Sequence, residues 1–528
     1  MILYITISWE VGLMKLYHAH RKALRLFLCL CTAILIVSPL LPLPSVSAAE
    51  ATDVTSVSNV VTSGFYNPPV VLDGSYRDYT NAYNGATVTA SNENGIAYVY
   101  FIFESPAPEF TVEDTEKGEK RTFGGCGMIH ELLDLEKAFG YAPKAIRIDL
   151  DFQIAVSEIY LFSSGELPDW VQVWEAPLTE SDMLLLVSHS DDDQLFFAGL
   201  LPIYAGEQGL KVQVAYFTNH NDVANRRHEL LDGLWHTGVR NYPIIAEFPD
   251  LYSESYDGAL WAYANAGYEK QDFTDFVYDL IQSTRPLVVV THDIEGEYGH
   301  GTHRLCAAAT IDALNKASAP DKHGDIDGKW NIAKLYIHLY EENKLTLDID
   351  RPLSAFGGKS AFKVSQEAFE YHISQHWTWF YGWLYGNGTD ITLSTQITTH
   401  SPREYGLYYS AVGMDTGHND LFENLETIAE REERLEEERR AEESREAEES
   451  RKAEESSRAE SESIAESISI SEAESIAAAS SENNSTSTTA EKVPTGDKTS
   501  HGKLPAVAVL VAAMVCVIIL LAIQFKRR

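Results

Sequence analysis

The pattern of apolar and polar positions divides the chain into three kinds of segment. Between residues 50 and 176, short runs alternate apolar and polar positions and are rich in aromatic and β-branched residues, with Gly, Pro, Asn and Asp between them. Examples are "IAYVYFIFES", "AIRIDLDFQ" and "WVQVWEA". A period of two is typical of strands that bury one face. Residues 50–176 therefore predict a β-sandwich or jelly-roll module of the size of one domain.

In residues 177–425, wholly apolar runs alternate with segments of helical period. The candidate strands are "MLLLVS", "KVQVAYFT", "YPIIAEF", "PLVVVTHD" and "KLYIHLY", and the candidate helices are "NRRHELLDGLWHTGV", "FTDFVYDLIQS" and "HRLCAAATIDALNKAS". This alternation predicts an α/β domain, a Rossmann-like and mostly parallel sheet with helices on both faces. In such a sheet the ligand crevice lies beyond the carboxyl ends of the strands.

Residues 426–503 are rich in Glu and Ser. A heptad-like seam, as in a coiled coil, begins with Leu421, Leu425, Ile428 and Leu435, but alanine then recurs every six residues from 441 to 465. A six-residue period winds around a helix instead of forming one stripe, so a sustained coiled coil is not expected. We predict a solvated acidic helical stalk that continues into a disordered linker.

Apolar segments at the two ends predict export and anchoring. Residues 1–49 have the form of a signal peptide, with basic residues from Lys15 to Arg25, an apolar run, and small residues for cleavage near Ala49; either Met1 or Met14 is the start. Residues 504–528 predict a transmembrane helix followed by a basic tail that stays inside. The intervening chain is therefore expected at the cell surface, held in the plasma membrane.

A second mode of anchoring is suggested just before the apolar C-terminal segment. The stretch from Val493 to Gly496, "VPTG", resembles a sortase sorting signal, which also precedes an apolar span and a basic tail. The spacer residue between proline and threonine is missing here. Attachment to the cell wall and plain retention in the membrane both stay open.

Charge and cysteine content restrict the class of protein. The formal net charge is −37 over 528 residues, which argues against a nucleic-acid partner because phosphate binding needs basic stripes. Of five cysteines, only Cys126 and Cys306 lie in the predicted exported part. Two cysteines do not make a disulfide framework, although a single bridge stays open.

The densest group of chemically active side chains follows the candidate strand "MLLLVS". His189 and the run from Asp191 to Asp193 lie at its carboxyl end, where an α/β sheet places its ligand. Carboxylates so close together repel one another unless a cation compensates them. His189 and Asp192, three residues apart in a tight loop, can converge on one point, which predicts a divalent metal.

A second group follows the candidate strand "PLVVVTHD". His300 and His303 have the i, i+3 spacing of one helix face and are expected at the same sheet edge. Together with His189 and Asp192 they give a three-ligand metal site with one spare imidazole, as in a catalytic zinc centre. Taken singly, an Asp run is more often a helix cap and His-x-x-His a surface pair, but both follow strands of one predicted sheet.

"VSHSDDDQLFFAG" and "THDIEGEYGHGTHRLCAAATIDAL" together resemble the PIG-L/LmbE-like zinc-dependent N-acetylglucosaminyl de-N-acetylases, over roughly residues 181–422. The resemblance implies zinc ligands at His189, Asp192 and His303. It implies that Asp191 is the general base for a metal-bound water, and that His300 is a protonated group that stabilises the oxyanion. The departures from the family motifs are Ser190 for proline, Asp193 for glutamate, and Gly301-Thr302 for Pro-Asp.

Several other residues have open assignments. Asp193 and His292 are expected to support the metal ligands or line the crevice, and Asp250 either contacts a sugar hydroxyl or belongs to a turn. His220 is expected to cap a helix or form a salt bridge rather than line the pocket. The aromatic run "HWTWFYGWLYG", residues 376–386, is expected mainly to pack, with one or two members free to stack on sugar. "VLDGSYRDYTNA" resembles galactose-binding-like modules, and an inert spacer is the alternative.

These features favour a surface-anchored, zinc-dependent hydrolase that removes acetyl groups from N-acetylated amino sugars. The family resemblance suggests N-acetylglucosaminyl conjugates, and predicted export favours an envelope or extracellular glycan. The main alternative is a non-catalytic glycan-binding adhesin on the same scaffold, and a third is a structural protein for surface display. The intact Asp191 and His300 argue against a pure binder, which needs neither.

Overall fold

The computed structural model describes residues 49–317 and 322–482. The predicted signal peptide, the sortase-like motif and the predicted transmembrane helix all lie outside these residues. Inside them, every helix is either too short or too polar to cross a bilayer. The described chain divides into two compact units, one that runs to Glu436 and one that starts at Glu437.

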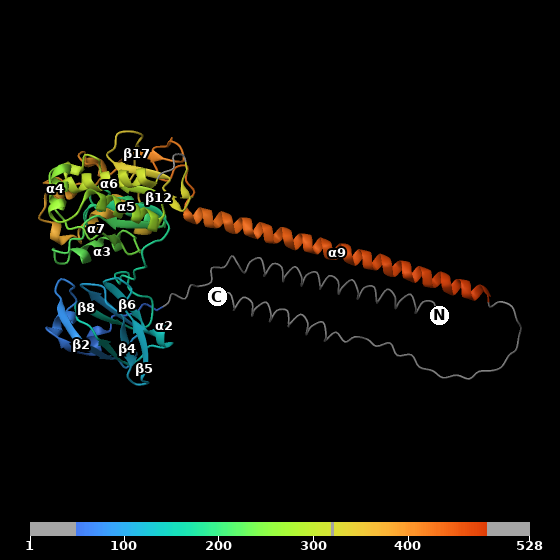
Figure 1. The fold of residues 1–528 in the computed structure, drawn as a ribbon. Coiled ribbons are helices and arrows are strands. Elements are labelled where there is room, and N and C mark those ends of the chain that lie inside the picture. The colour runs from blue at the N-terminus through green and yellow to red at the C-terminus, as the bar shows by residue number, and fades with distance from the viewer. Residues whose placement is uncertain (1–48, 318–321, 483–528) are drawn as a thin grey trace, which may run out of the picture. The chain divides into compact units, whose positions relative to one another are not determined.

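The N-terminal module is all antiparallel (blue in Figure 1). Eight strands join in the order β5-β4-β7-β2-β8-β3-β6, with β1 on β2. They are β1 (Asn59–Phe65), β2 (Thr80–Ser91), β3 (Tyr98–Phe103), β4 (Phe110–Asp114), β5 (Glu119–Phe123), β6 (His130–Asp134), β7 (Ala145–Leu150) and β8 (Ile154–Phe162), with the short helix α2 (Leu135–Phe139) after β6. Alternate residues of β4 and β7 are buried, as the sequence pattern predicted. The finer prediction of a jelly roll stays a prediction.

The second sheet has the order β11-β10-β9-β12-β15-β17-β16. Its strands are β9 (Ser181–Val187), β10 (Val212–Tyr216), β11 (Ile244–Ile245), β12 (Pro286–Thr291), β15 (Lys334–His338), β16 (Lys344–Thr346) and β17 (Glu404–Ser410); β13 (Gly324–Ile326) and β14 (Lys329–Asn331) form a separate hairpin. The first five strands are parallel, and β17 pairs antiparallel with both β15 and β16. The predicted α/β class is confirmed.

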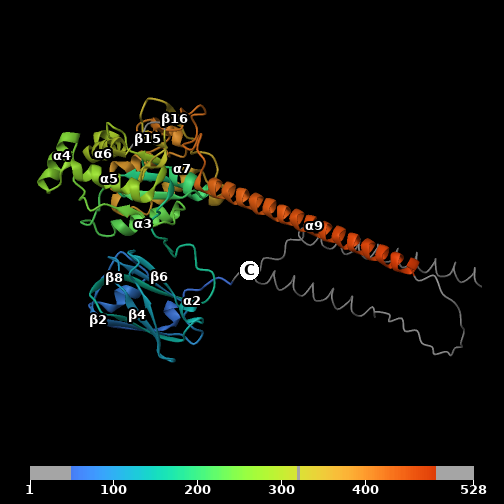
Figure 2. The same cartoon turned by 45° about the vertical axis from the view of Figure 1, so that its right-hand side comes forward.

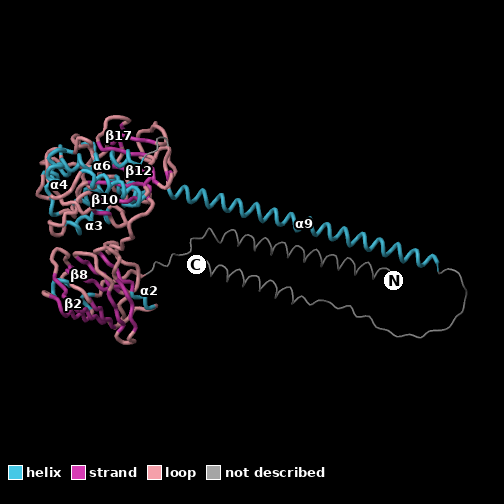
Figure 3. The backbone as a smooth tube through the Cα atoms, viewed as in Figure 1, coloured by secondary structure: helices cyan, strands magenta, loops and turns pink. Residues whose placement is uncertain are grey.

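The helices of this part are α3 (Arg226–His236), α4 (Tyr256–Asn265), α5 (Lys270–Thr284), α6 (Gly301–Ala317), α7 (Ala361–Phe369) and α8 (Trp379–Tyr385). Figure 3 draws these helices in cyan among the magenta strands of the same part; along the chain, α4 and α5 follow one another, as do α7 and α8. Every residue of β9, β10, β12 and β15 is buried. A strand that is covered on both faces has apolar residues at successive positions. For this reason the sequences of these strands do not alternate between apolar and polar residues.

The order of the strands predicts where a ligand crevice lies. From β9 the sheet grows through β10 to β11 on one side, and through β12 to β15 on the other. The order therefore reverses between β9 and β12. In an open α/β sheet the carboxyl ends of two such strands border the binding crevice. The residues that follow Val187 and Thr291 thus meet at one place, although they are about a hundred positions apart in the sequence.

The stalk is a continuous helix, α9 (Ile428–Glu482), drawn in orange in Figure 2. Its first turn belongs to the globular core, because Ile428 is fully buried and its N–H donates to Asp182. Leu421 is buried in the same core. The interpretation of these two residues as a coiled-coil seam is therefore wrong, since both pack inside the α/β part. From Glu437 to Ala473, by contrast, every side chain is exposed, as expected of a solvated helix.

Candidate functional site

The loop after β9 folds around the carboxylate of Asp192. All residues from Ser188 to Gln194 are buried. The His189 N–H donates to Asp192 Oδ2 at 2.6 Å, which closes a tight turn. The Ser188 N–H donates to His292 Nε2 at 2.8 Å and so ties the end of β9 to the residue that follows β12. Both strand ends are thus held together at the reversal of strand order.

His300, the residue just before α6, and His303 in the first turn of α6 lie at the same place, with ring centroids 4.6 Å apart. Gly301 explains one departure from the family motif. Its N–H donates to the Ser253 carbonyl at 2.7 Å, and a Cβ there would lie 2.4 Å from the Ser255 carbonyl oxygen. Proline lacks this N–H, so it could not make the bond.

A second departure, Ser190 in place of proline, has a similar cause. The Ser190 N–H donates to His220 Nε2 at 3.1 Å, and its hydroxyl oxygen accepts from Arg226 Nε at 2.7 Å. Proline could supply neither group. The departures therefore replace motif residues with local hydrogen bonds, and none of them removes a predicted ligand.

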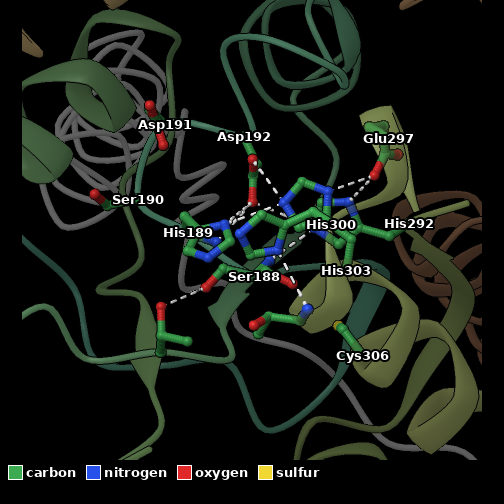
Figure 4. A network of polar contacts seen from close by, with 12 residues as sticks. Ser188, His189, Ser190, Asp191, Asp192, His292, Glu297, His300, His303 and Cys306 are labelled. Atoms are coloured by element: carbon green, nitrogen blue, oxygen red, sulfur yellow. Dashed lines mark hydrogen bonds and ion pairs between the residues drawn. The ribbon is translucent and has the colours of Figure 1, made fainter. Parts of the chain in front are cut away.

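The structure brings the three predicted metal ligands together (Figure 4). His189 Nδ1 lies 3.1 Å from Asp192 Oδ2 and 3.1 Å from His303 Nε2, and His303 Nε2 lies 3.5 Å from Asp192 Oδ1. Zinc bonds to nitrogen and oxygen are about 2.0–2.2 Å, so ligand atoms of a tetrahedral site lie roughly 3.3–3.6 Å apart. The measured separations match those edges to within a few tenths of an ångström.

A competing set of donors shares two members with the first. Asp192, His292 and His303 also place ligand atoms close together, as do His189, His300 and His303. His292, however, already uses both ring nitrogens. Its Nε2 accepts from the Ser188 N–H, and its Nδ1 lies 2.7 Å from Glu297 Oε2. His189 Nδ1 has no such competing backbone donor, so the set with His189 is favoured and His292 acts as support.

Glu297 organises the histidines and was missed by sequence reasoning. Its carboxylate is fully buried and lies 2.7 Å from the Nδ1 atoms of His292 and His303 and 2.6 Å from that of His338. When the Glu297 carboxylate accepts a hydrogen bond from Nδ1–H of His303, the proton of that ring is fixed on Nδ1. The Nε2 atom of His303 then has a lone pair that faces Asp192. Burial alone would raise the pKa of Glu297, but the histidines hold it well below its usual value.

Asp250 plays a similar part for His189. Its carboxylate oxygens lie 3.4 Å from His189 Nε2 and 3.3 Å from His220 Nδ1. With Nε2 paired to Asp250, the Nδ1 atom of His189 is free to face the other ligands. His220 thus pairs with Asp250 at the wall of the site, which is the salt-bridge alternative expected above, whereas the residue that precedes α3 as its N-cap is Asn225. Asp250 therefore lies behind a predicted metal ligand, and its expected contact with a sugar hydroxyl stays a prediction.

The adjacent aspartates have different surroundings. Burial would raise the pKa of Asp192, but His303, His189 and His292 hold it well below its usual range, so Asp192 is ionised. Burial raises the pKa of Asp191, against the opposing charge of Arg226, whose Nη2 donates to Asp191 Oδ1 at 2.9 Å. In Figure 4 Asp192 points into the histidine cluster, and Asp191 lies to its side.

Asp193 contributes no ligand. It accepts a hydrogen bond from the side chain of Gln194, and its other oxygen, Oδ1, is buried without a hydrogen-bond partner among the described residues. Burial raises the pKa of Asp193 well above its usual value. The expected role of Asp193 in supporting the metal ligands stays a prediction.

Burial and the neighbouring His189 and His303 lower the pKa of His300 to about 2, which favours a neutral ring, and the protonated state expected above stays a prediction. The Thr302 N–H donates to His300 Nδ1 at 3.2 Å, which places the ring proton on Nε2. A neutral ring can still donate one hydrogen bond to a developing oxyanion.

Aromatic side chains surround the histidines. The Tyr252 ring lies 5.2 Å from that of His300, and Tyr298 lies 5.5 Å from both His300 and Trp379. Tyr252 is 67% exposed and Trp379 50% exposed, so both present apolar faces to solvent. In the run 376–386, Leu384 is buried while Trp377 is highly exposed. Some side chains of that run therefore pack in the interior, and others are exposed to solvent.

Comparison with known proteins matches residues 184–314 to the family model described as "PIG-L: GlcNAc-PI de-N-acetylase". The 1D-myo-inositol 2-acetamido-2-deoxy-alpha-D-glucopyranoside deacetylase of Geodermatophilus obscurus is 34% identical over 83 residues, 16% of this chain and 28% of that protein. Its namesake in Rhodococcus jostii is 26% identical over 195 residues, 33% of this chain and 66% of that protein.

The chain spans only 17–28% of the length of the first three curated relatives. Among solved structures, the 4-carboxy-2-hydroxymuconate hydratase of Pseudomonas putida is 14% identical, with 45% of this chain and 100% of that chain covered and a TM-score of 0.28. A score this low supports no argument about fold or function. The matched residues 184–314 contain every metal-ligating and catalytic residue predicted above.

Proposed function

Residues 184–314 form a domain of the PIG-L family of deacetylases, and from this premise we propose that the protein hydrolyses the acetamide group of N-acetylated amino sugars with the help of one zinc ion. The observation that carries the proposal is the convergence of His189, Asp192 and His303 at the edge lengths of a tetrahedral zinc site, with Asp191 beside them.

The donor set fits zinc. Two neutral imidazoles and one carboxylate, with a fourth position open, are the ligands of many catalytic zinc sites. Each histidine of the set has its other ring nitrogen paired, His303 to Glu297 and His189 to Asp250. When bound, zinc polarises a carbonyl oxygen and makes a water molecule acidic near neutral pH.

The side chains around the set divide the proton transfers between them. Asp191 accepts a proton from the attacking water, and the Arg226 guanidinium holds its carboxylate in place. His300 donates from Nε2 to the oxyanion that forms as water adds to the acetamide carbon. As the carbon–nitrogen bond breaks, the proton on Asp191 passes to the leaving nitrogen. The products are acetate and a free amine.

The proposed substrate is an N-acetylglucosaminyl conjugate. The matched family and the relatives named above are deacetylases of such compounds by their descriptions. Tyr252 and Trp379 present exposed rings at the mouth of the site, and sugar rings offer an apolar face to such rings. The apolar segments at residues 1–49 and 504–528 support a place at the cell surface, with an envelope or extracellular glycan as substrate.

The proposal is tested by measuring bound zinc and acetate release on the purified full chain with N-acetylglucosaminyl-inositol and chitooligosaccharides. We expect about one zinc per chain and acetate release that stops when zinc is chelated and returns when it is restored. The variant Asp191→Asn should keep zinc and lose acetate release. Glycan binding without turnover in the zinc-loaded wild type would favour the adhesin instead.

A further inference from the structure

A cavity lies away from the metal ligands and is lined by both parts of the compact unit that ends at Glu436. It has a volume of about 600 Å³. Ligand pockets in proteins measure roughly 300–1,000 Å³. Its walls come from the N-terminal module and the segment that follows it, with Tyr76, Tyr160 and Trp170, and from the α/β part, with Asp232, Trp235 and Tyr371.

The two walls are joined by hydrogen bonds within this unit. The Tyr76 hydroxyl and the Gln172 amide both donate to Asp232 of α3, and the Trp235 indole N–H donates to the Asp169 carbonyl at 2.6 Å. His228 of the same helix lies 3.2 Å from His130 and 3.1 Å from Glu104. The cavity is therefore bordered by paired side chains from both walls.

The lining offers aromatic faces to solvent. Trp170 is 48% exposed, and its ring stands edge-on to that of Tyr160 with centroids 4.9 Å apart. Tyr371 is 39% exposed. Large aromatic side chains are usually buried, so two half-exposed rings in one concave site indicate a surface kept for a ligand.

The polar groups of the cavity favour a neutral ligand. Both Asp232 oxygens already accept hydrogen bonds, and the Arg240 guanidinium lies 3.8 Å over the Trp235 ring and donates to two backbone carbonyls. The charges of Asp232 and Arg240 are thus engaged, and Asp169 is the other acidic residue of the lining. Over residues 49–317 and 322–482, no hydrogen bond is made by the Trp170 indole N–H or by the hydroxyl groups of Tyr160 and Tyr371, so these groups remain for a ligand.

We propose that this cavity, the aromatic cleft, binds a neutral oligosaccharide chain without hydrolysing it. A sugar ring has an apolar face that stacks on aromatic rings and hydroxyl groups that bond to neutral donors and acceptors, and the aromatic cleft presents both. It holds no counterpart of the metal-ligand set. The proposal goes beyond the acetamide hydrolysis assigned to the metal centre and does not depend on it.

The aromatic cleft is separate from the metal centre, but helix α3 connects the two. Helix α3 begins at Arg226, which pairs with Asp191, and ends at His236, which lines the aromatic cleft. Ten residue steps at about 1.5 Å give roughly 15 Å between these two ends. A glycan held in the cleft is thus anchored on the helix that positions the proposed base.

The test is isothermal titration calorimetry on the full chain that carries Asp191→Asn, so that no substrate is turned over. The probes are neutral hexasaccharides: chitohexaose, cellohexaose and maltohexaose. We expect at least one probe to bind, and Trp170→Ala and Tyr371→Ala each to weaken that binding roughly tenfold, the scale of a lost aromatic contact. The control variants Trp261→Ala and Tyr66→Ala remove aromatic rings that are also exposed but lie outside the cleft, and should bind as the parent does.

The substitutions come from opposite walls, so a folding defect in one leaves the other as a test, and thermal melts identify such a defect. In the chain with Asp191 intact, both cleft variants should release acetate from a monosaccharide-sized substrate at the parent rate. The proposal is overturned if no probe binds, or if binding is the same in the parent and in a folded cleft variant. Because the titration measures binding to the Asp191→Asn chain and requires no turnover, failure of the deacetylase proposal would leave this result intact.

Discussion

Glu297 offers a sharp test of how the metal centre is held. The change Glu297→Gln replaces a buried carboxylate that accepts from the Nδ1 atoms of His292, His303 and His338. An amide has one oxygen acceptor, and its nitrogen is only a donor. The amide NH₂ group must therefore face at least one histidine Nδ1–H, where a donor meets a donor. At least one imidazole then changes its tautomer or its orientation.

The size of the effect follows from these contacts. Replacing partners behind metal-ligating histidines costs about 10–100-fold in metal affinity, which is roughly 1.4–2.7 kcal/mol. Alanine is a poorer choice for the experiment. It would leave three buried donors unpaired at about 1–3 kcal/mol each, a total comparable to the whole stability of a domain. Glutamine keeps the shape and one acceptor.

The assay is competition for zinc against a chromophoric chelator, followed by acetate release at saturating zinc. We expect Glu297→Gln to bind zinc 10–100-fold more weakly and to recover part of its acetate release when zinc is in excess. Glu295→Gln is the matched control, because that side chain is 79% exposed and two residues away. Zinc affinity within twofold of the parent in a folded Glu297→Gln protein would show that Glu297 does not position the ligands.

Three further changes address other parts of the structure. Asp191→Asn should lower kcat for acetate release by about 10²–10⁴-fold while zinc affinity stays within a few-fold, and a large loss of zinc would instead make Asp191 a ligand. Tyr252→Ala should raise KM for the sugar substrate more than it lowers kcat, because its exposed ring flanks His300; an unchanged KM would remove it from the substrate site. Asp415→Asn should cost about 3–5 kcal/mol in urea unfolding, since it leaves the buried Lys334 ammonium without its charge partner, whereas Asp275→Asn in an exposed pair should cost under about 1 kcal/mol. Equal effects of the last two would contradict the burial argument.

Much of the α/β part could be predicted because its signals are local. The strand "MLLLVS" and the helix that begins near His300 are readable from periodicity, and the carboxyl ends of parallel strands must meet at one edge. This is enough to bring His189, Asp192 and His303 together from segments more than a hundred residues apart.

The supporting side chains could not be predicted in the same way. Glu297 lies in a Gly-rich turn and looks like an ordinary surface acid in the sequence, although the fold buries it among three histidines. Arg226 begins a helix, where only the tertiary fold shows that its guanidinium meets Asp191. Ile428 continued an apparent heptad seam, but it packs in the globular core instead. Each outcome depends on the contacts of one side chain, which periodicity does not encode.

The location of the bound metal is the measurement that decides the proposed chemistry. Crystals of the zinc-loaded protein, with anomalous diffraction recorded at the zinc edge, give that location directly. We expect one peak about 2.0–2.2 Å from His189 Nδ1, His303 Nε2 and an oxygen of Asp192, with a fourth position open near Asp191. A peak bound by Asp192, His292 and His303 with His189 free, or no zinc peak in protein that releases acetate, would contradict the proposed site.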